Sequence, residues 1–160
     1  FLTWLQEKTA PVFVIATANN VEDIPPEFMR AGRFDECFFV GLPGKTGRKQ
    51  IFDILIRKKN RKSGSFNIDK LVESTDGYSG AEIEKVISTA LFKSYSENKR
   101  EVTTDDILDA ISNFSPLSTT REEEFKKREE WAKGRCIMAN TIDGINLKVD
   151  NMKKDISIET

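Results

Sequence analysis

The sequence predicts an α/β fold in which the last part of a parallel sheet is followed by a bundle of helices. Two apolar runs, residues 12–16 and 36–40, are rich in β-branched and aromatic residues, which is typical of strands buried on both faces. After Gly44, apolar residues recur at helical spacing instead. A chain of 160 residues has room for one small domain and a piece of another.

Three segments are predicted to organise the chain. Residues 1–44 form the end of an α/β core, and the turn-forming residues 41–44 are the hinge to a helical domain at 45–115. Residues 116–160 hold a charged helix and a polar tail, which we expect to be poorly ordered from Asn140 onward. The first residues have the pattern of a helix already under way, so we expect the chain to continue a longer protein.

The helical domain is predicted from two helix starts and from apolar stripes. Ser79 with Glu82, and Thr103 with Asp106, have the spacing of a capping box, in which each side chain bonds the main-chain N–H of the other residue. The stripes predict the faces that pack into the core. They consist of Ile51, Phe52, Leu55 and Ile56, then Ile68, Leu71 and Val72, then Ile83, Val86, Ile87, Ala90, Leu91 and Tyr95, then Ile107, Leu108, Ile111 and Phe114.

The helix predicted at residues 119–133 is charged over most of its surface. Its large apolar residues are Phe125 and Trp131. We therefore expect a surface helix that two aromatic side chains anchor.

Composition excludes several classes of function. The formal net charge is −1 and histidine is absent, so neither a global attraction for nucleic acid nor imidazole catalysis is expected. The apolar runs are far shorter than the stretch of about 20 residues that spans a bilayer, so we expect a soluble protein without a membrane partner. Cys37 and Cys136 lie far apart in sequence and form no CxxC pair, so we expect neither a disulfide nor a metal site.

A phosphate-binding loop is suggested by Gly44-Lys45-Thr46 but is not completed. The pattern GxxxxGK[ST] requires a glycine at position 39, where the sequence has Phe39. We therefore interpret Leu42-Pro43-Gly44 as an interdomain hinge and do not expect phosphate binding here.

Two other places carry candidate site residues, each with an alternative. Asn19 follows the first predicted strand, where open α/β sheets bind ligands, and its amide can bind a phosphate or orient a water, or simply cap a turn. Arg30 and Arg33 follow a short helix and can bind phosphate oxygens in a fork. Alternatively, Arg33 pairs with Asp35 or Glu36 at the surface. The residues alone leave these alternatives open.

Taken in order, residues 16–19, 26–35, 42–43 and 76–83 resemble the motifs of AAA ATPases. The resemblance implies a P-loop-type parallel αβα sheet followed by an α-helical lid bundle. It implies that Asn19 is the sensor-1 asparagine and that Arg30 and Arg33 are arginine fingers, which reach the ATP of the neighbouring subunit.

The same resemblance implies a nucleotide site at the start of the lid helix. Gly80 and Ala81 correspond to a Gly-Ala pair that lies against the nucleotide, and Ile51 is a further nucleotide contact that the resemblance implies. Small residues at a helix N-terminus allow a ligand to approach closely. The cofactor expected is ATP. The family's Walker A lysine and Walker B acidic pair, which act with Mg²⁺, are absent from this chain, so we expect the chain alone to be inactive.

Residues 18–20 and 116–135 resemble, more narrowly, an uncharacterised AAA family of cyanobacteria and algal plastid genomes. That resemblance implies the plastid stroma or the cyanobacterial cytoplasm. The intact protein is expected to be a homo-oligomer, a hexameric ring, which hydrolyses ATP to remodel an unknown protein. The alternative is a scaffold or binding module that has kept the fold without the chemistry. A third class, an AAA protein directed to DNA, gains no support from the balanced charge, so nucleic acid is not expected as a partner.

Overall fold

The computed structural model describes residues 2–20, 23–30 and 33–139, except for the side chains of Leu2 and Met29. These residues form two compact units. The first unit is made of Phe1–Gly41 and Arg121–Ala139, and the second begins at Leu42 and extends to Thr120. The predicted disorder after Asn140 lies outside the described residues.

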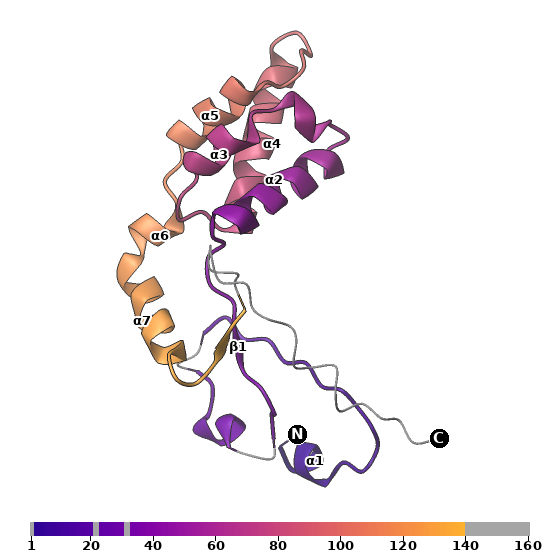
Figure 1. The fold of residues 1–160 in the computed structure, drawn as a ribbon, viewed down its shortest axis with the longest axis vertical. Coiled ribbons are helices and arrows are strands. Elements are labelled where there is room, and N and C mark those ends of the chain that lie inside the picture. Colours follow the sequence, from indigo (N-terminus) through magenta and orange to yellow (C-terminus); the bar gives the residue numbers. More distant parts are fainter. Residues whose placement is uncertain (1, 21–22, 31–32, 140–160) are drawn as a thin grey trace. The chain divides into compact units, whose positions relative to one another are not determined.

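The first unit combines short helices with one pair of parallel strands. Its elements are α1 (Leu2–Glu7), the 3-10 helix η1 (Pro26–Met29), β1 (Phe38–Phe39), α7 (Glu122–Ala132) and β2 (Ile137–Met138) (Figure 1). Phe38 pairs with Ile137, and the main-chain N–H of Ile137 donates to the carbonyl of Cys37 at 2.7 Å. The predicted strand at residues 36–40 is therefore confirmed in shortened form as β1.

The strand predicted at residues 12–16 is wrong. Phe13 is 91% exposed and Ile15 is 78% exposed, and the backbone here makes no strand pairing. A strand of a parallel sheet needs a neighbour for its main-chain N–H and C=O groups and apolar cover on its faces. Within residues 2–20, 23–30 and 33–139, strand pairing is confined to β1 and β2.

The prediction that the cysteines stay unpaired is also wrong, because Cys37 and Cys136 form a disulfide. Their sequence separation is 99 and their Cα atoms lie 4.7 Å apart. Each cysteine immediately precedes a strand, and the parallel register of β1 and β2 brings the two side by side. Sequence distance could not predict this pairing, since it depends on which strands become neighbours.

The charged helix predicted at residues 119–133 is replaced by two helices in the structure. Leu117–Thr120 forms α6 of the second unit, and α7 begins at Glu122. In α7, Lys126 pairs with Glu122 at 2.5 Å and Arg128 pairs with Glu124 at 3.8 Å. Ala132 is fully buried at its end. The two predicted anchors, Phe125 and Trp131, are half-buried.

The second unit is a helical bundle with one apolar core. Besides α6, its elements are α2 (Lys45–Lys58), η2 (Ser63–Ser65), α3 (Ile68–Glu73), α4 (Gly80–Ser96) and α5 (Thr104–Ser112) (Figure 1). The predicted stripes supply most of the core, with one exception. Tyr95 is 62% exposed, because it lies in the last turn of α4, and the ammonium of Lys99 lies 5.9 Å from its ring centre. The buried core consists of Phe52, Ile56, Leu71, Val72, Tyr78, Ile83, Val86, Ile87, Ala90, Val102, Ile107 and Ile111.

Both predicted capping boxes are confirmed, and they explain where α4 and α5 begin. At α5, the carboxylate of Asp106 accepts the main-chain N–H of Thr103 at 2.8 Å. It also accepts two bonds from the guanidinium of Arg100, each of 2.7 Å. The Arg100 bonds, followed by those from Thr103, hold the pKa of Asp106 well below its usual range.

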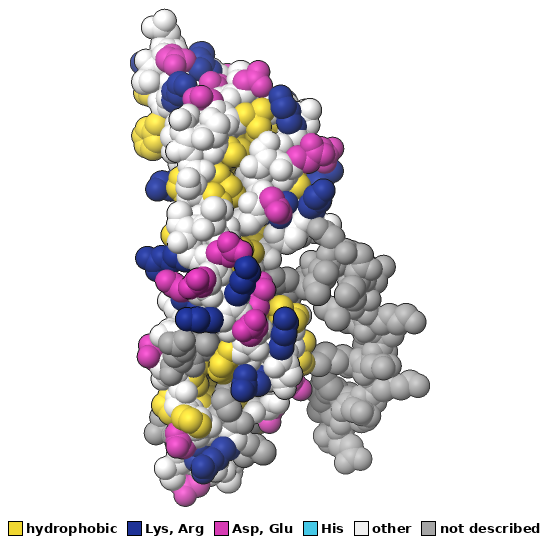
Figure 2. Space-filling model, turned by 90° about the vertical axis from the view of Figure 1, so that its left-hand side faces the viewer, with side chains coloured by type: hydrophobic (Ala, Val, Ile, Leu, Met, Phe, Trp, Pro, Cys, Tyr) yellow, Lys and Arg dark blue, Asp and Glu magenta, His cyan; other side chains and the backbone are white. Residues whose placement is uncertain are grey.

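Figure 2 shows one face, on which basic and acidic side chains are interspersed. Among the residues that the structure describes, no helix combines the length and the apolar character that crossing a bilayer requires.

Candidate functional site

The segment before α4 is held firmly at several points. We call residues 76–81 the lid loop. Tyr78 in this loop is 4% exposed, and its hydroxyl donates to the carbonyl of Phe114 at 2.8 Å. Burial, and then the charge of Glu82, raise the pKa of Tyr78, so the hydroxyl remains protonated and can donate. This bond anchors the lid loop to the chain that follows α5.

Glu82 fixes the other end of the lid loop. Its Oε2 accepts the main-chain N–H of Ser79 at 2.7 Å, and its Oε1 accepts the main-chain N–H of Leu117 at 2.7 Å. Burial by itself would raise the pKa of Glu82, but the hydrogen bonds from Leu117 and Ser79 outweigh burial and lower it. One ionised carboxylate therefore joins the start of α4 to the start of α6.

The fold requires glycine at position 77 but not at position 80. Gly77 has a φ of +74°, and a Cβ atom there would lie 2.5 Å from Oγ of Ser118. Both the backbone and the packing therefore require glycine at this position. At Gly80 the nearest atom to a Cβ would be Cδ1 of Ile51, at an ordinary contact distance of 3.7 Å. The fold of this unit does not require glycine there.

Three of the predicted site residues thus belong to one compact unit. The structure brings Ile51 of α2 next to Gly80 at the N-terminus of α4, and Ala81 beside them is exposed. The main-chain N–H groups at the start of a helix favour negative charge, and the small residues leave these groups approachable. The arrangement fits the phosphate or ribose side of a nucleotide.

The other three predicted site residues belong to the first unit. Asn19 lies exposed at a bend, and the amide of the next residue, Asn20, donates to Asp23 at 2.8 Å. Arg30 is exposed directly after η1. The structure brings Ile51 and Gly80 together, whereas Asn19 and Arg30 stay on separate segments of the first unit.

Arg33 folds back onto η1. Its Nη1 donates to the main-chain carbonyl of Glu27, and its Nε is buried without a hydrogen-bond partner. The rings of Phe28 in η1 and of Phe34, the residue after Arg33, stack with their centres 6.2 Å apart. The hydrogen bond that the structure gives this guanidinium thus goes to the main chain and not to Asp35, so its side chain is positioned by η1.

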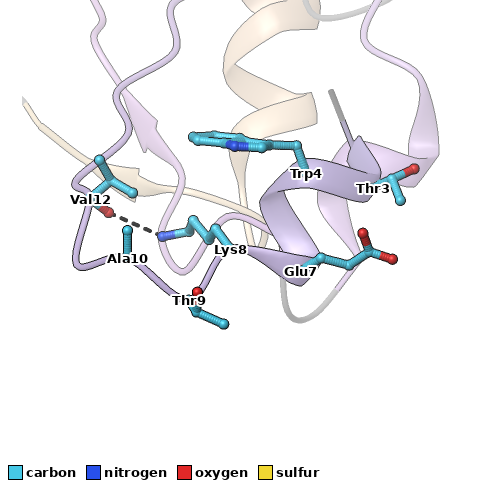
Figure 3. A pocket seen from close by; sticks show the side chains of 7 residues that line it. All are labelled: Thr3, Trp4, Glu7, Lys8, Thr9, Ala10 and Val12. Carbon is cyan, nitrogen blue, oxygen red and sulfur yellow. Dashed lines mark hydrogen bonds between the residues drawn. The ribbon is translucent and has the colours of Figure 1, made fainter.

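A hollow of about 630 Å³ lies next to α1 (Figure 3). Trp4 and Lys8 of the α1 region line it, and Nζ of Lys8 donates to the carbonyl of Val12 at 3.1 Å. None of the six predicted site residues is among its lining residues, so this hollow and the candidate site are separate features.

One buried charged residue, Arg48, was not identified from the sequence. Arg48 of α2 is 2% exposed and lies one turn before Phe52, which lies one turn before Ile56. All three are buried at a spacing of four residues, so the signal was an arginine in line with an apolar stripe. The guanidinium of Arg48 contacts the lid loop through Asp76, at 3.1 Å.

Two family models match different parts of the chain. Residues 1–42 match the model of the ATPase family associated with various cellular activities (AAA). Residues 65–109 match the model of the AAA+ lid domain. The lid loop, Gly80 and Ala81 fall within the second match, and Asn19, Arg30 and Arg33 fall within the first.

Similar proteins carry the same family name. The chain is 45% identical over 133 residues to an uncharacterized AAA domain-containing protein, ycf46, of Guillardia theta, with 82% of this chain and 26% of that protein covered. It is 46% identical over 141 residues to the ycf46 protein of Gracilaria tenuistipitata var. liui, covering 87% of this chain and 28% of the relative. It is 31% identical over 121 residues to a proteasome-activating nucleotidase of Saccharolobus islandicus, with 76% of this chain and 30% of that protein covered. The chain thus spans less than a third of the length of these relatives, and it belongs to the AAA family, of which it carries part of an AAA domain followed by an AAA+ lid domain.

Proposed function

We propose that the complete protein is an ATPase that couples ATP binding and hydrolysis to movement of the lid against the core, and thereby remodels a protein substrate. The family and the similarity to a proteasome-activating nucleotidase support this proposal. Its subunits form a homo-oligomeric ring, hexameric as in the AAA family, in which Arg30 and Arg33 of one subunit act on the ATP of the next. By its similarity to ycf46 proteins, the protein works in a plastid stroma or a cyanobacterial cytoplasm.

The observation that carries the proposal is the open N-terminus of α4 beside Ile51. Gly80 is not needed for backbone strain or packing, since a Cβ atom there would make only an ordinary contact with Ile51. A small residue at this place keeps the helix N-terminus accessible to a ligand. The residues of this chain that hold ATP are Gly80, Ala81 and Ile51, with Asn19 orienting a water or a phosphate oxygen. Mg²⁺ would shield the phosphate charge and belongs to Walker residues that this chain lacks.

The first test is ATP turnover and nucleotide binding by the complete protein. Gly80→Arg should leave the lid folded but obstruct the nucleotide, and should raise its dissociation constant. Arg33→Ala should lower turnover by about 10³ to 10⁵ with little change in that constant, because an arginine finger stabilises charge that develops during phosphoryl transfer. Arg57→Ala is the matched control, since Arg57 is a surface arginine that pairs with Asp53.

The assignment of Arg33 to the neighbouring subunit needs a mixing experiment. Arg33→Ala subunits are mixed with subunits whose phosphate-binding loop is disabled. Some turnover should return, because an intact site can then meet an intact arginine. No recovery in rings that have exchanged subunits would exclude action between subunits. Complete protein that binds no nucleotide would favour the scaffold function instead.

This chain alone should neither turn over ATP nor bind it tightly, since it contains no GxxxxGK[ST] sequence. Calorimetry of the isolated chain checks this directly. Micromolar affinity for ATP would show that the lid loop binds nucleotide without a phosphate-binding loop.

A further inference from the structure

Arg48 is a buried, charged side chain of α2 in the helical unit. It is 2% exposed, and its Nε is buried without a hydrogen-bond partner. Arginine keeps its charge in proteins, and its planar guanidinium presents donors in a fixed fork. Such a group can hold several acceptors in one fixed arrangement.

The acceptors of Arg48 come from three different segments of the same compact unit. Nη1 donates to the carbonyl of Pro43 at 3.0 Å, in the hinge segment before α2. Nη2 donates to the carbonyl of Val72 at 3.3 Å, near the end of α3. Nη2 also lies 3.1 Å from Oδ1 of Asp76, the first residue of the lid loop. One rigid group therefore sets the distance between the hinge and the lid loop.

Stability is a poor explanation for this arrangement. Burying a guanidinium costs desolvation, and well-packed apolar residues in place of buried ion pairs are often neutral or stabilising. The cost is higher here because Nε gains no partner and because the side chain of Asp76 is 90% exposed, which weakens the ion pair. The buried guanidinium of Arg48 is therefore better explained by the fixed positions that it gives to its acceptors than by a gain in stability.

That geometry reaches the candidate nucleotide site. Arg48 holds Asp76 at one end of the lid loop, and Glu82 holds Ser79 and Leu117 at the other. Gly80 directly follows Ser79 and lies between Asp76 and Glu82 in the sequence. We propose that Arg48 is a positioning residue that couples the hinge at Pro43 to the lid loop, so that hinge movement and nucleotide contact change together. The inference rests on the proposed function, because it assigns nucleotide contact to the lid loop.

The test uses the complete protein with Arg48→Met, which removes the guanidinium and keeps an unbranched apolar stem. We expect the nucleotide dissociation constant and KM to rise by about tenfold and kcat to fall by a similar factor, as misplaced contacts cost rate and binding together. Thermal unfolding should change little. Lys49→Met is the matched control, because Lys49 is the next residue of α2 and makes a surface ion pair with Asp69 at 2.7 Å. It should leave all these quantities unchanged.

A second variant keeps the proposal testable if Arg48→Met fails to fold. Asp76→Asn removes the exposed end of the ion pair and leaves the bonds to Pro43 and Val72 in place. It should raise KM in the same direction by a smaller factor, with normal thermal unfolding. Unchanged KM and kcat in folded Arg48→Met, or in Asp76→Asn if the first does not fold, would overturn the inference.

The outcomes also separate the two proposals. Wild-type protein that neither binds nor hydrolyses nucleotide would defeat the proposed function and, with it, the inference. Wild-type protein that binds without turnover still tests Arg48 through the dissociation constant. Active wild-type protein with unaffected variants would defeat the inference alone.

Discussion

Glu82 joins the starts of α4 and α6, since its carboxylate accepts the main-chain N–H of Leu117, 35 residues further along the chain, at 2.7 Å and also accepts the main-chain N–H of Ser79, the N-cap of α4. A capping residue thus also fixes where α6 begins. The lid loop is held by the contact of Glu82 with Ser79 and by the bond from Tyr78 to the carbonyl of Phe114. Its shape is therefore set by side chains from outside the loop as well as by the loop itself.

Glu82→Gln should lower the free energy of unfolding of the lid by about 1 to 3 kcal/mol at neutral pH, because an amide replaces a charged acceptor of two part-buried main-chain N–H groups. The folded-state pKa of Glu82 is lowered, so its contribution is present above the unfolded pKa and is lost as pH falls through the folded pKa. The difference between wild type and variant should therefore shrink below about pH 4. Urea unfolding followed by far-UV circular dichroism across the acid range measures it.

Glu84→Gln is the control for that experiment. Glu84 lies on the same helix, and its carboxylate approaches Lys58 and Lys59 only at 3.8 and 3.9 Å, near the surface. The control should change stability by less than about 1 kcal/mol. Equal effects of the two variants would contradict a special role for Glu82.

Gly77→Ala and Gly80→Ala should have opposite outcomes, although both add one methyl group. Gly77→Ala should lower the melting temperature of the lid, since Gly77 has a φ of +74° and the methyl would lie 2.5 Å from Ser118 Oγ. Gly80→Ala should leave it unchanged or raise it slightly, since the methyl makes an ordinary contact with Ile51. Thermal unfolding of both variants tests this. Comparable destabilisation at Gly80 would mean that the fold itself demands glycine there.

Asp106→Asn should destabilise the lid by about 1.5 to 3 kcal/mol, because its carboxylate accepts charged hydrogen bonds from Arg100 besides capping α5. The pKa of Asp106 is lowered, so this contribution persists to lower pH than that of an ordinary aspartate and is then lost on further acidification. Asp105→Asn is the matched control, since its side chain is 89% exposed and lies 3.9 Å from Lys70. Denaturant midpoints should separate the two variants clearly; equal midpoints would refute the prediction.

Reduction of the disulfide between Cys37 and Cys136 should destabilise the first unit by about 2 to 4 kcal/mol, because the bond closes a long loop in the unfolded chain. This chain has two tryptophans, Trp4 and Trp131, and both belong to that unit. Tryptophan fluorescence during urea unfolding therefore reports on the first unit by itself. The midpoint should fall when a dithiol reductant is added.

Cys37→Ser should reproduce that fall without reductant and should become insensitive to it. An unchanged fluorescence midpoint after complete reduction, verified by thiol labelling, would show that the pairing of β1 and β2 does not depend on the disulfide.

The sequence by itself determined the features that depend on nearby residues. The caps at Ser79 and Thr103, the boundaries of α4 and α5, and most of the core stripes follow from contacts three or four residues apart. The motifs that resemble AAA proteins were also local in sequence, which is why the candidate residues, Gly80 among them, could be named in advance.

Only the tertiary structure decided features that depend on distant segments. Residues 12–16 have strand-forming side chains, but a strand exists only where another segment pairs with it. Cys37 pairs with Cys136 because of the strand register, and Arg48 contacts Val72 and Asp76 because of the packing of α2. Such contacts are fixed by how elements pack together, and spacing along the chain carries no information about that.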